Sequence, residues 1–211
     1  MKIYLSLLII LIFITSCKKE SVAPPVLLGS AEGYDNSGTY LPLTKGYTWT
    51  YIIAGNDDDD DNGNSYEYNL TGKLFTFNGI QFTEFTNPVL HYLAHVGNKY
   101  FLLTFFDGGT IAMPILDEDQ PAGVNNVETT TYSFGPGMPT VNCMLNTSEK
   151  NTSKTINGKV YNDVISTLIT LQDAKNPFME IIYGIDFAKG IGVISYNDGQ
   201  IAETLKSHSF K

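Results

Sequence analysis

The feature that most constrains the fold of this chain is a repeated unit, in which short segments of alternating apolar and polar residues are separated by tight-turn dipeptides. The clearest case is Asn78-Gly79, which lies between the apolar-rich segments 74–77 and 80–82. Asn-Gly readily adopts the positive backbone angles that a two-residue turn between antiparallel strands requires. The sequence therefore predicts a series of antiparallel hairpins. Three further turn signals divide apolar segments in the same way: Asp107-Gly108-Gly109, Asn157-Gly158 and Asp198-Gly199.

The segments between these turns have the period of two that is typical of strands with one buried face. In the segment 47–51, aromatic residues alternate with threonine, and the segment 101–103 is apolar at every position. A run that is apolar on both faces is typical of a strand covered on each side. The residues predicted to share a buried face in the three alternating segments are Tyr47, Trp49 and Tyr51, then Tyr66, Tyr68 and Leu70, then Met179, Ile181, Tyr183, Ile185 and Phe187.

These patterns predict a single all-β domain over residues 40–211, because no second domain boundary and no internal repeat interrupts them. About 170 residues are enough to bury an ample core. Hairpin-rich strands of this number can close as a barrel, stack as a β-sandwich or curl as an open half-barrel, and the strand pattern is compatible with all three shapes. The 12 phenylalanines and 13 tyrosines favour a large interior lined by aromatic side chains.

The N-terminus has the composition of an export signal. After Met1-Lys2, residues 3–14 form an apolar run broken only by Ser6, too short for a membrane-spanning helix but suited to the core of a signal peptide. The run ends in Ile14-Thr15-Ser16-Cys17, which resembles the lipobox of bacterial lipoproteins. The resemblance implies that residues 1–16 are removed and that Cys17 carries acyl chains such as palmitate, which anchor the protein to a membrane. Residues 17–39 then form a lipidated, flexible tether.

Charge and cysteine content narrow the classes of partner. Of the 13 basic residues, Lys2 lies in the signal segment, so the mature chain would carry 12 basic against 22 acidic residues, a net charge of −10. An acidic chain is a poor ligand for nucleic acid or for anionic lipid, so we expect neither as a partner. Once Cys17 is acylated, Cys143 is the sole thiol. Because Val141, Cys143 and Leu145 share a strand face, we expect Cys143 to be a small buried apolar residue.

Two segments resemble a broad group of Bacteroidetes-type secreted lipoproteins. Residues 40–51 are similar to their Y-x-P-L-x-x-G-x-x-W-x-Y strand, and residues 187–194 to their closing Y-A-K-G-V-G-L-V strand; residues 155–164 echo a strand between them. The resemblance implies one antiparallel, strongly curved sheet, either a half-barrel like that of the lipoprotein carriers or barrel-like, and it supplies no catalytic residues. We therefore expect this curved sheet, with a β-sandwich as the alternative. We expect both segments to be architectural, with Trp49 in the core and with Gly190 and Gly192 at a bend or a close approach of two chains.

The resemblance also implies a location. In this group of lipoproteins, acidic residues directly after the lipidated cysteine are associated with display on the outer face of the outer membrane. Here the corresponding segment, Lys18-Lys19-Glu20, is of mixed charge. We therefore expect an outer-membrane lipoprotein and favour the cell surface over the periplasmic face.

The acidic run 57–61 contains the one candidate metal site in the sequence. Asp58, Asp60 and Asn62, followed by Gly63, match the first half of a calcium loop, in which oxygen ligands at alternate positions precede a glycine turn. The second half does not match, because Asn69 stands where a bidentate glutamate is needed. The alternative is a solvated acidic loop between two strands, so we expect no cofactor unless this loop binds calcium.

Other chemistry-bearing residues form no recognised catalytic motif. His91 and His95 are four residues apart, but the glutamate of a His-Glu-x-x-His zinc site is replaced by Tyr92. Asp117, Glu118, Asp119 and Asp163 could supply the pair of carboxylates that glycoside hydrolysis needs. This observation is not specific, because any two acidic residues meet the same condition. No catalytic residue is therefore predicted.

Together these observations favour a membrane-anchored lipoprotein of the bacterial envelope that acts as a binding module without catalysis. A curved sheet rich in aromatic residues suits an apolar ligand or a glycan. The alternatives are an accessory lipoprotein that docks an envelope protein and, less well supported, a hydrolase. A ligand carrier should have a sizeable internal cavity, whereas a docking protein should have a filled core and an exposed apolar patch.

Overall fold

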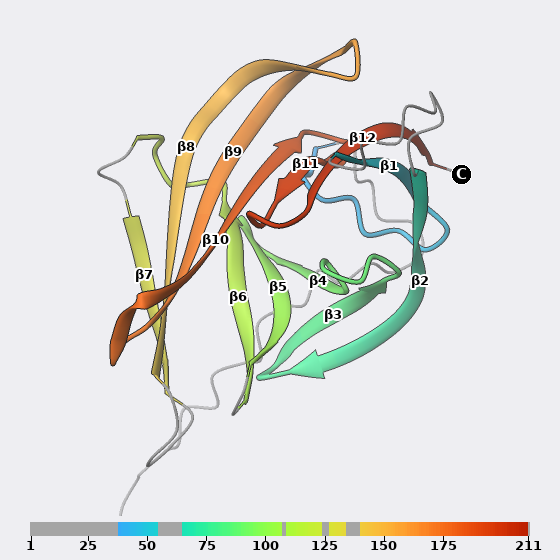
Figure 1. Ribbon diagram of the computed structural model, residues 1–211. Helices are drawn as coiled ribbons and strands as arrows, with labels where there is room; N and C mark the ends of the chain where they lie inside the picture. The colour runs from blue at the N-terminus through green and yellow to red at the C-terminus, as the bar shows by residue number, and fades with distance from the viewer. Residues whose placement is uncertain (1–37, 55–64, 107–108, 124–126, 134–139, 211) are drawn as a thin grey trace, which may run out of the picture.

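The protein is described here by a computed structural model covering residues 38–54, 65–106, 109–123, 127–133 and 140–210. Within these ranges the chain forms twelve strands, all in one antiparallel sheet that curls into a nearly closed barrel (Figure 1). The prediction of a single curved all-β sheet is thus confirmed, and the structure is not a sandwich. The strands are β1 (Thr48–Ala54), β2 (Ser65–Phe77), β3 (Ile80–Phe85), β4 (Tyr92–Val96), β5 (Lys99–Phe106), β6 (Gly109–Asp117), β7 (Val127–Ser133), β8 (Thr140–Ile156), β9 (Lys159–Asp173), β10 (Asn176–Ala188), β11 (Gly192–Asn197) and β12 (Ala202–Ser209).

The topology is that of an up-and-down barrel with one break. The strand order is β6-β5-β4-β3-β2-β1-β12-β11-β10-β9-β8-β7, so strands that follow one another in sequence are paired, except β6 and β7. The first and last strands pair with each other, from Thr48 opposite Ser209 to Ala54 opposite Ala202. Two six-strand meanders are therefore joined through β1 and β12, and the sheet is open between β6 and β7.

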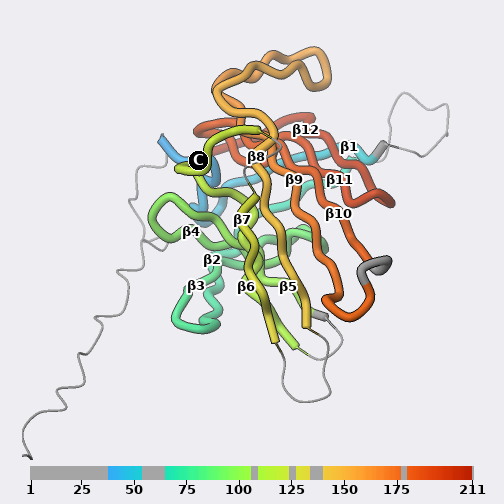
Figure 2. The backbone as a smooth tube through the Cα atoms, turned by 90° about the vertical axis from the view of Figure 1, so that its left-hand side faces the viewer, coloured from blue at the N-terminus to red at the C-terminus, as the bar shows by residue number. Residues whose placement is uncertain are grey.

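Side chains bridge this break. The Tyr132 hydroxyl of β7 donates to the Ala112 carbonyl of β6 at 2.5 Å, and Lys99 of β5 forms an ion pair with Glu128 of β7. In the connection after β6, the buried Gln120 donates to the Leu145 carbonyl of β8 and accepts from the Thr147 hydroxyl. The two edges of the sheet thus lie side by side although no strand ladder joins them (Figure 2).

The predicted turns explain the tight hairpins. Asn78 and Gly79 have φ values of 48° and 78°, and Asn157 and Gly158 have 50° and 75°, the left-handed pair that a two-residue hairpin turn needs. At the β11–β12 turn, Gly199 has a φ of 84° and the Asp198 carboxylate accepts from the N–H groups of Gln200 and Ile201. Residues 107–108 lie outside the described ranges, although Phe106 and Gly109 on either side are paired.

The alternating segments are buried over only part of their length. Trp49 and Tyr51 are in the core as expected, but Tyr66 and Ile181 are each 43% exposed. The predicted burial of Tyr66 and Ile181 is therefore wrong. Their cross-strand partners, Tyr51 and Leu171, are both in the core, so burial changes between paired positions of neighbouring strands. On β10, full burial is reached at Ile185 and Phe187.

The two segments with family resemblance pack against each other. The Trp49 indole N–H donates to the Ile191 carbonyl at 2.7 Å, and the Tyr51 hydroxyl donates to the Val193 carbonyl at 2.8 Å. Gly192, between these two carbonyls, has a φ of 106°, and a β-carbon there would lie 3.4 Å from Trp49 Nε1 and 3.5 Å from Pro42 Cδ. A glycine is needed at Gly192 both for the backbone angle and for the close approach of the indole ring.

We predict that Gly192→Ala lowers the free energy of unfolding by about 1–3 kcal/mol, because alanine is strained at this φ and its methyl group would crowd Trp49. The matched control is Gly184→Ala on β10, where the nearest atom to an added β-carbon is 4.0 Å away; we expect a change within about 0.5 kcal/mol. Urea unfolding of the two variants measures the difference. Equal midpoints would show that the contact between Trp49 and Gly192 is not under steric constraint.

Candidate functional site

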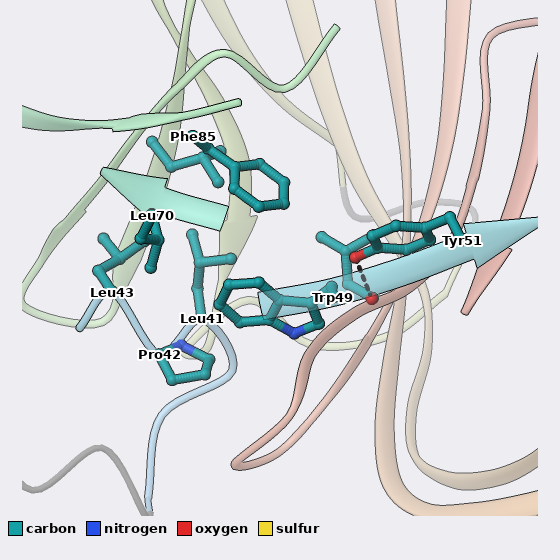
Figure 3. Close-up of a pocket in the computed structure, with 9 residues that line it drawn as sticks. Leu41, Pro42, Leu43, Trp49, Tyr51, Leu70 and Phe85 are labelled. Atoms are coloured by element: carbon teal, nitrogen blue, oxygen red, sulfur yellow. Dashed lines mark hydrogen bonds between the residues drawn. The ribbon is translucent and has the colours of Figure 1, made fainter. Parts of the chain in front are cut away.

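Many buried apolar side chains pack together inside the barrel. A pocket between the segment before β1 and the strands around it (Figure 3) has a volume of about 10 Å³, comparable to the space that one water molecule occupies. Ligand pockets are usually several hundred Å³. The pocket is lined by residues from the segment before β1 and from five strands: Leu41, Pro42, Leu43, Trp49, Tyr51, Leu70, Phe85, Leu93 and Val193.

The segment before β1 supplies much of this filling. Tyr40, Leu41 and Leu43 are each less than 10% exposed, and Leu41, Pro42 and Leu43 line the pocket alongside Trp49 (Figure 3). Thr39 fixes the start of the segment, because its carbonyl accepts from the Gly190 N–H at 2.6 Å. Residues 40–43, which match the Y-x-P-L part of the family motif, therefore form a plug in the barrel. This plug occupies space that an internal ligand would need.

Two of the acids that sequence analysis considered for hydrolysis lie at this plug, where tyrosine residues bind them. Tyr40 donates its hydroxyl to Asp163 at 2.9 Å, and its backbone N–H donates to the Tyr100 hydroxyl oxygen at 3.2 Å. Tyr100 in turn donates to Glu118. Burial, followed by the hydrogen bond to Asp163, raises the pKa of Tyr40 far above its usual value, so the tyrosine remains a donor. The arrangement fastens the plug to β5, β9 and the connection after β6.

The interior also contains a buried carboxylate that sequence analysis did not identify. Glu203 of β12 is 3% exposed and accepts from the Tyr68 hydroxyl at 3.2 Å and from the Asn87 amide at 3.0 Å, both neutral donors. Burial raises the pKa of Glu203 more than the bonds from Asn87 and Tyr68 lower it, and the Asp198 carboxylate raises it further. Asn87 also accepts from the N–H groups of Val89 and Leu90, so Glu203 holds the β3–β4 connection in place.

Glu203 was missed because its surroundings in the sequence resemble those of an ordinary solvent-facing strand residue. Its partners lie 135 and 116 residues away in the chain. One signal in the sequence could have suggested that Glu203 is buried. The neighbouring residues Ala202, Thr204 and Leu205 do not alternate between polar and apolar, so the sequence does not assign Glu203 to a solvent-facing side of β12.

Cys143 has the environment that was predicted. Val141, Cys143 and Leu145 are all buried on one face of β8. Burial raises the pKa of the Cys143 thiol to about 12, so the thiol is protonated at neutral pH and is a poor nucleophile.

The two spaced histidines lie in different surroundings. His91 precedes β4 and lies 3.7 Å from Glu84, whereas His95 stacks on Tyr100 with ring centroids 4.3 Å apart. Burial lowers the pKa of His95, which favours the neutral imidazole. In the described ranges, no group of three or more His, Cys, Asp or Glu side chains is placed to hold a metal ion.

The predicted lipidation and calcium residues lie outside the described residues. These are Cys17 and, in the acidic run, Asp58, Asp60 and Asn62. The described part of the chain contains no helix with the length and apolar character needed to cross a membrane.

A second apolar cluster lies on the outside of the barrel. Along β4 and β5, Leu93 and Leu102 belong to the interior core, whereas their neighbours Ala94 and Leu103 belong to a separate buried cluster with Phe82 and Ala112. Because side chains of a strand alternate between its faces, this cluster lies on the outer face of the wall. The two-sided apolar run 101–103 in the sequence predicted that both faces of this strand would be covered.

Comparison with known proteins gives one structural likeness. No protein-family model matches the chain, and no curated protein matches it. Among solved structures, the chain is similar to a candidate lipoprotein from Parabacteroides distasonis, with 13% sequence identity and a TM-score of 0.42 over 83% of this chain and 100% of the other.

We predict that Glu203→Gln stabilises the protein relative to the wild type more at pH 7.5 than at pH 4. Because the pKa of Glu203 is raised by folding, the folded chain binds this proton more tightly than the unfolded chain. The contribution of Glu203 to stability is therefore present at low pH and is lost as the pH rises through the raised pKa. Glutamine keeps an acceptor for the Asn87 amide but has no charge to bury.

The measurement is urea unfolding of both proteins at several pH values between 4 and 7.5. Glu180→Gln, at an exposed position on β10, is the control for the loss of one negative charge. A stability difference between Glu203→Gln and wild type that does not change with pH, or that changes as much for Glu180→Gln, would contradict the prediction.

Proposed function

We propose that this chain is a lipid-anchored protein of the bacterial outer membrane, displayed toward the cell surface, whose β-domain is a binding module without catalytic activity. The anchor is supported by the sequence Ile14-Thr15-Ser16-Cys17 after a short apolar core. Acylation at Cys17 would hold the domain at the membrane through the tether.

The proposed mode of binding is supported by one observation, the small size of the pocket beside Trp49. An apolar ligand carried inside the barrel would need a cavity many times larger than the one of about 10 Å³ beside Trp49. The plug segment that fills this space is fixed by hydrogen bonds at Thr39 and Tyr40. We therefore favour the docking of a protein partner on the outer surface over transport of a small apolar ligand or binding of a glycan in a concave site.

The anchor can be tested with Cys17→Ser in the full chain. We expect the wild type to sediment with membranes and to incorporate labelled palmitate, and the variant to be released into the soluble fraction without label. The reason is that serine has no thiol to acylate. A variant that stays in the membrane fraction would show that the lipobox assignment is wrong.

The binding mode can be tested by native mass spectrometry of the released Cys17→Ser protein. Docking through the outer surface predicts the mass of the polypeptide alone, because the pocket beside Trp49 is too small for a ligand. A bound lipid or another small molecule that survives gentle purification would instead support a carrier and would identify its ligand class.

A further inference from the structure

The outer wall formed by β2–β6 has an apolar face in addition to the barrel core. Phe75 of β2 is paired with Phe82 of β3, Ala94 of β4 with Phe101 of β5, and Phe101 with Pro114 of β6. The register of β3 with β4 places Phe82 next to Ala94, so one apolar row crosses all five strands. In a barrel whose outside faces water, polar residues are expected at these positions.

A second row adjoins the first. Tyr92 of β4 is paired with Leu103 of β5, and Leu103 with Ala112 of β6. The rings of Tyr92 and Phe75 are 5.7 Å apart, which joins the two rows. Phe75, Phe82, Tyr92, Phe101, Leu103 and Phe105 together form what we call the outer apolar face. It lies on the wall made by β2–β6 (Figure 1).

The exposed members of this face lie at its border. Phe82 and Leu103 are buried by their neighbours, whereas Phe75 is 42% and Phe105 63% exposed. A phenylalanine as exposed as Phe105, next to a packed apolar surface, resembles the aromatic anchors that contribute most of the binding energy in protein interfaces.

Charged groups flank the face on two sides, and they are paired. On one side Glu84 lies 3.1 Å from Lys73 and 3.7 Å from His91. On the other, Lys99 lies 3.0 Å from Asp117 and 2.9 Å from Glu128. An apolar centre with a polar rim of both charges is typical of protein–protein interfaces. Anionic lipid would require unpaired basic groups, and both lysines of the rim are already neutralised.

The size of the face indicates what kind of protein surface fits it. Five strands spaced about 4.8 Å apart span roughly 19 Å, and the distance along β5 from Phe101 to Phe105 is roughly 14 Å at about 3.4 Å per residue. The resulting area is on the order of 300 Å², whereas a stable dimer needs roughly 800 Å² from each partner. A second copy would therefore gain too little contact, but one short segment with two or three apolar side chains would cover the face.

We propose that the outer apolar face binds a short amphipathic segment of a protein partner, with Phe105 as the main anchor. This inference rests on the proposed function, in which the domain docks a partner through its outer surface. The partner segment would insert apolar side chains between Phe75, Phe101 and Phe105, and its flanking polar groups would meet the Glu84 and Lys99 sides of the rim.

The test is photo-crosslinking in the native envelope, with the full chain carrying p-benzoyl-phenylalanine at position 105. The control carries the same residue at position 168, where Leu168 is 42% exposed on the outer side of β9. We expect crosslinks from position 105 to map to one continuous segment of a single partner and none from position 168. A synthetic peptide of that segment should bind the purified protein. Phe105→Ser should weaken its binding at least about tenfold, whereas Leu168→Ser should change it less than about twofold.

Each other outcome contradicts this inference. Crosslinks to another copy of this chain, crosslinks to lipid, crosslinks scattered over several proteins, or no crosslink at position 105 would each overturn it. Because Phe105 is mostly exposed, we expect Phe105→Ser to unfold at nearly the wild-type temperature. If Phe105→Ser is destabilised, Phe75→Ser replaces it in the peptide-binding measurement. Fractionation of the same cells tests the lipid anchor independently. If the protein is not in the membrane fraction but still crosslinks to one partner segment through position 105, the anchor is contradicted and the docking inference is not.

Discussion

The architecture depends on the contact between the start of the domain and the turn before β11. Trp49 donates to the Ile191 carbonyl, Tyr51 donates to the Val193 carbonyl, and Gly192 between them leaves room for the indole ring. This contact brings together segments about 140 residues apart and lies beside the pairing of β1 with β12. Together with the β1–β12 pairing and the side-chain bonds across the break between β6 and β7, this contact holds the two halves of the sheet in one barrel.

The same contact determines what the interior can hold. Since Pro42 lies against Gly192, the segment before β1 is directed into the barrel and fills it with Leu41 and Leu43. The aromatic content that suggested a ligand cavity is instead used to fill the space that twelve strands enclose. Phe75 and Phe105 are among the large apolar side chains that stay exposed, and they lie on the convex side of the sheet, where we propose that a partner binds.

Local patterns were sufficient to predict the strands and the hairpins at Asn78-Gly79 and Asn157-Gly158, because a turn depends on the residues within it. The curvature of the sheet was instead predicted from the family resemblance, because local patterns are compatible with a barrel, a half-barrel or a sandwich. Burial along a strand was predicted less well. Tyr66 and Ile181 follow the same alternation as Tyr68 and Ile185, but they are exposed although their cross-strand partners Tyr51 and Leu171 are buried. Burial at these positions depends on tertiary packing, which the alternation does not encode. Glu203 shows the same limit for the candidate site, since its partners come from β2 and the β3–β4 connection and no local pattern refers to them.

The outer apolar face could be predicted in part from the sequence, because of a property that all barrels share. In a closed sheet one face of each strand is buried inside, so a run that is apolar on both faces, such as 101–103, requires a second cover outside. In the described part of this chain, that cover consists of side chains from the wall itself, with Phe75 and Phe105 left at its border. Phe105 gains little from folding at its present exposure, and its place next to the packed residues Phe101 and Leu103 is what the proposed binding face requires.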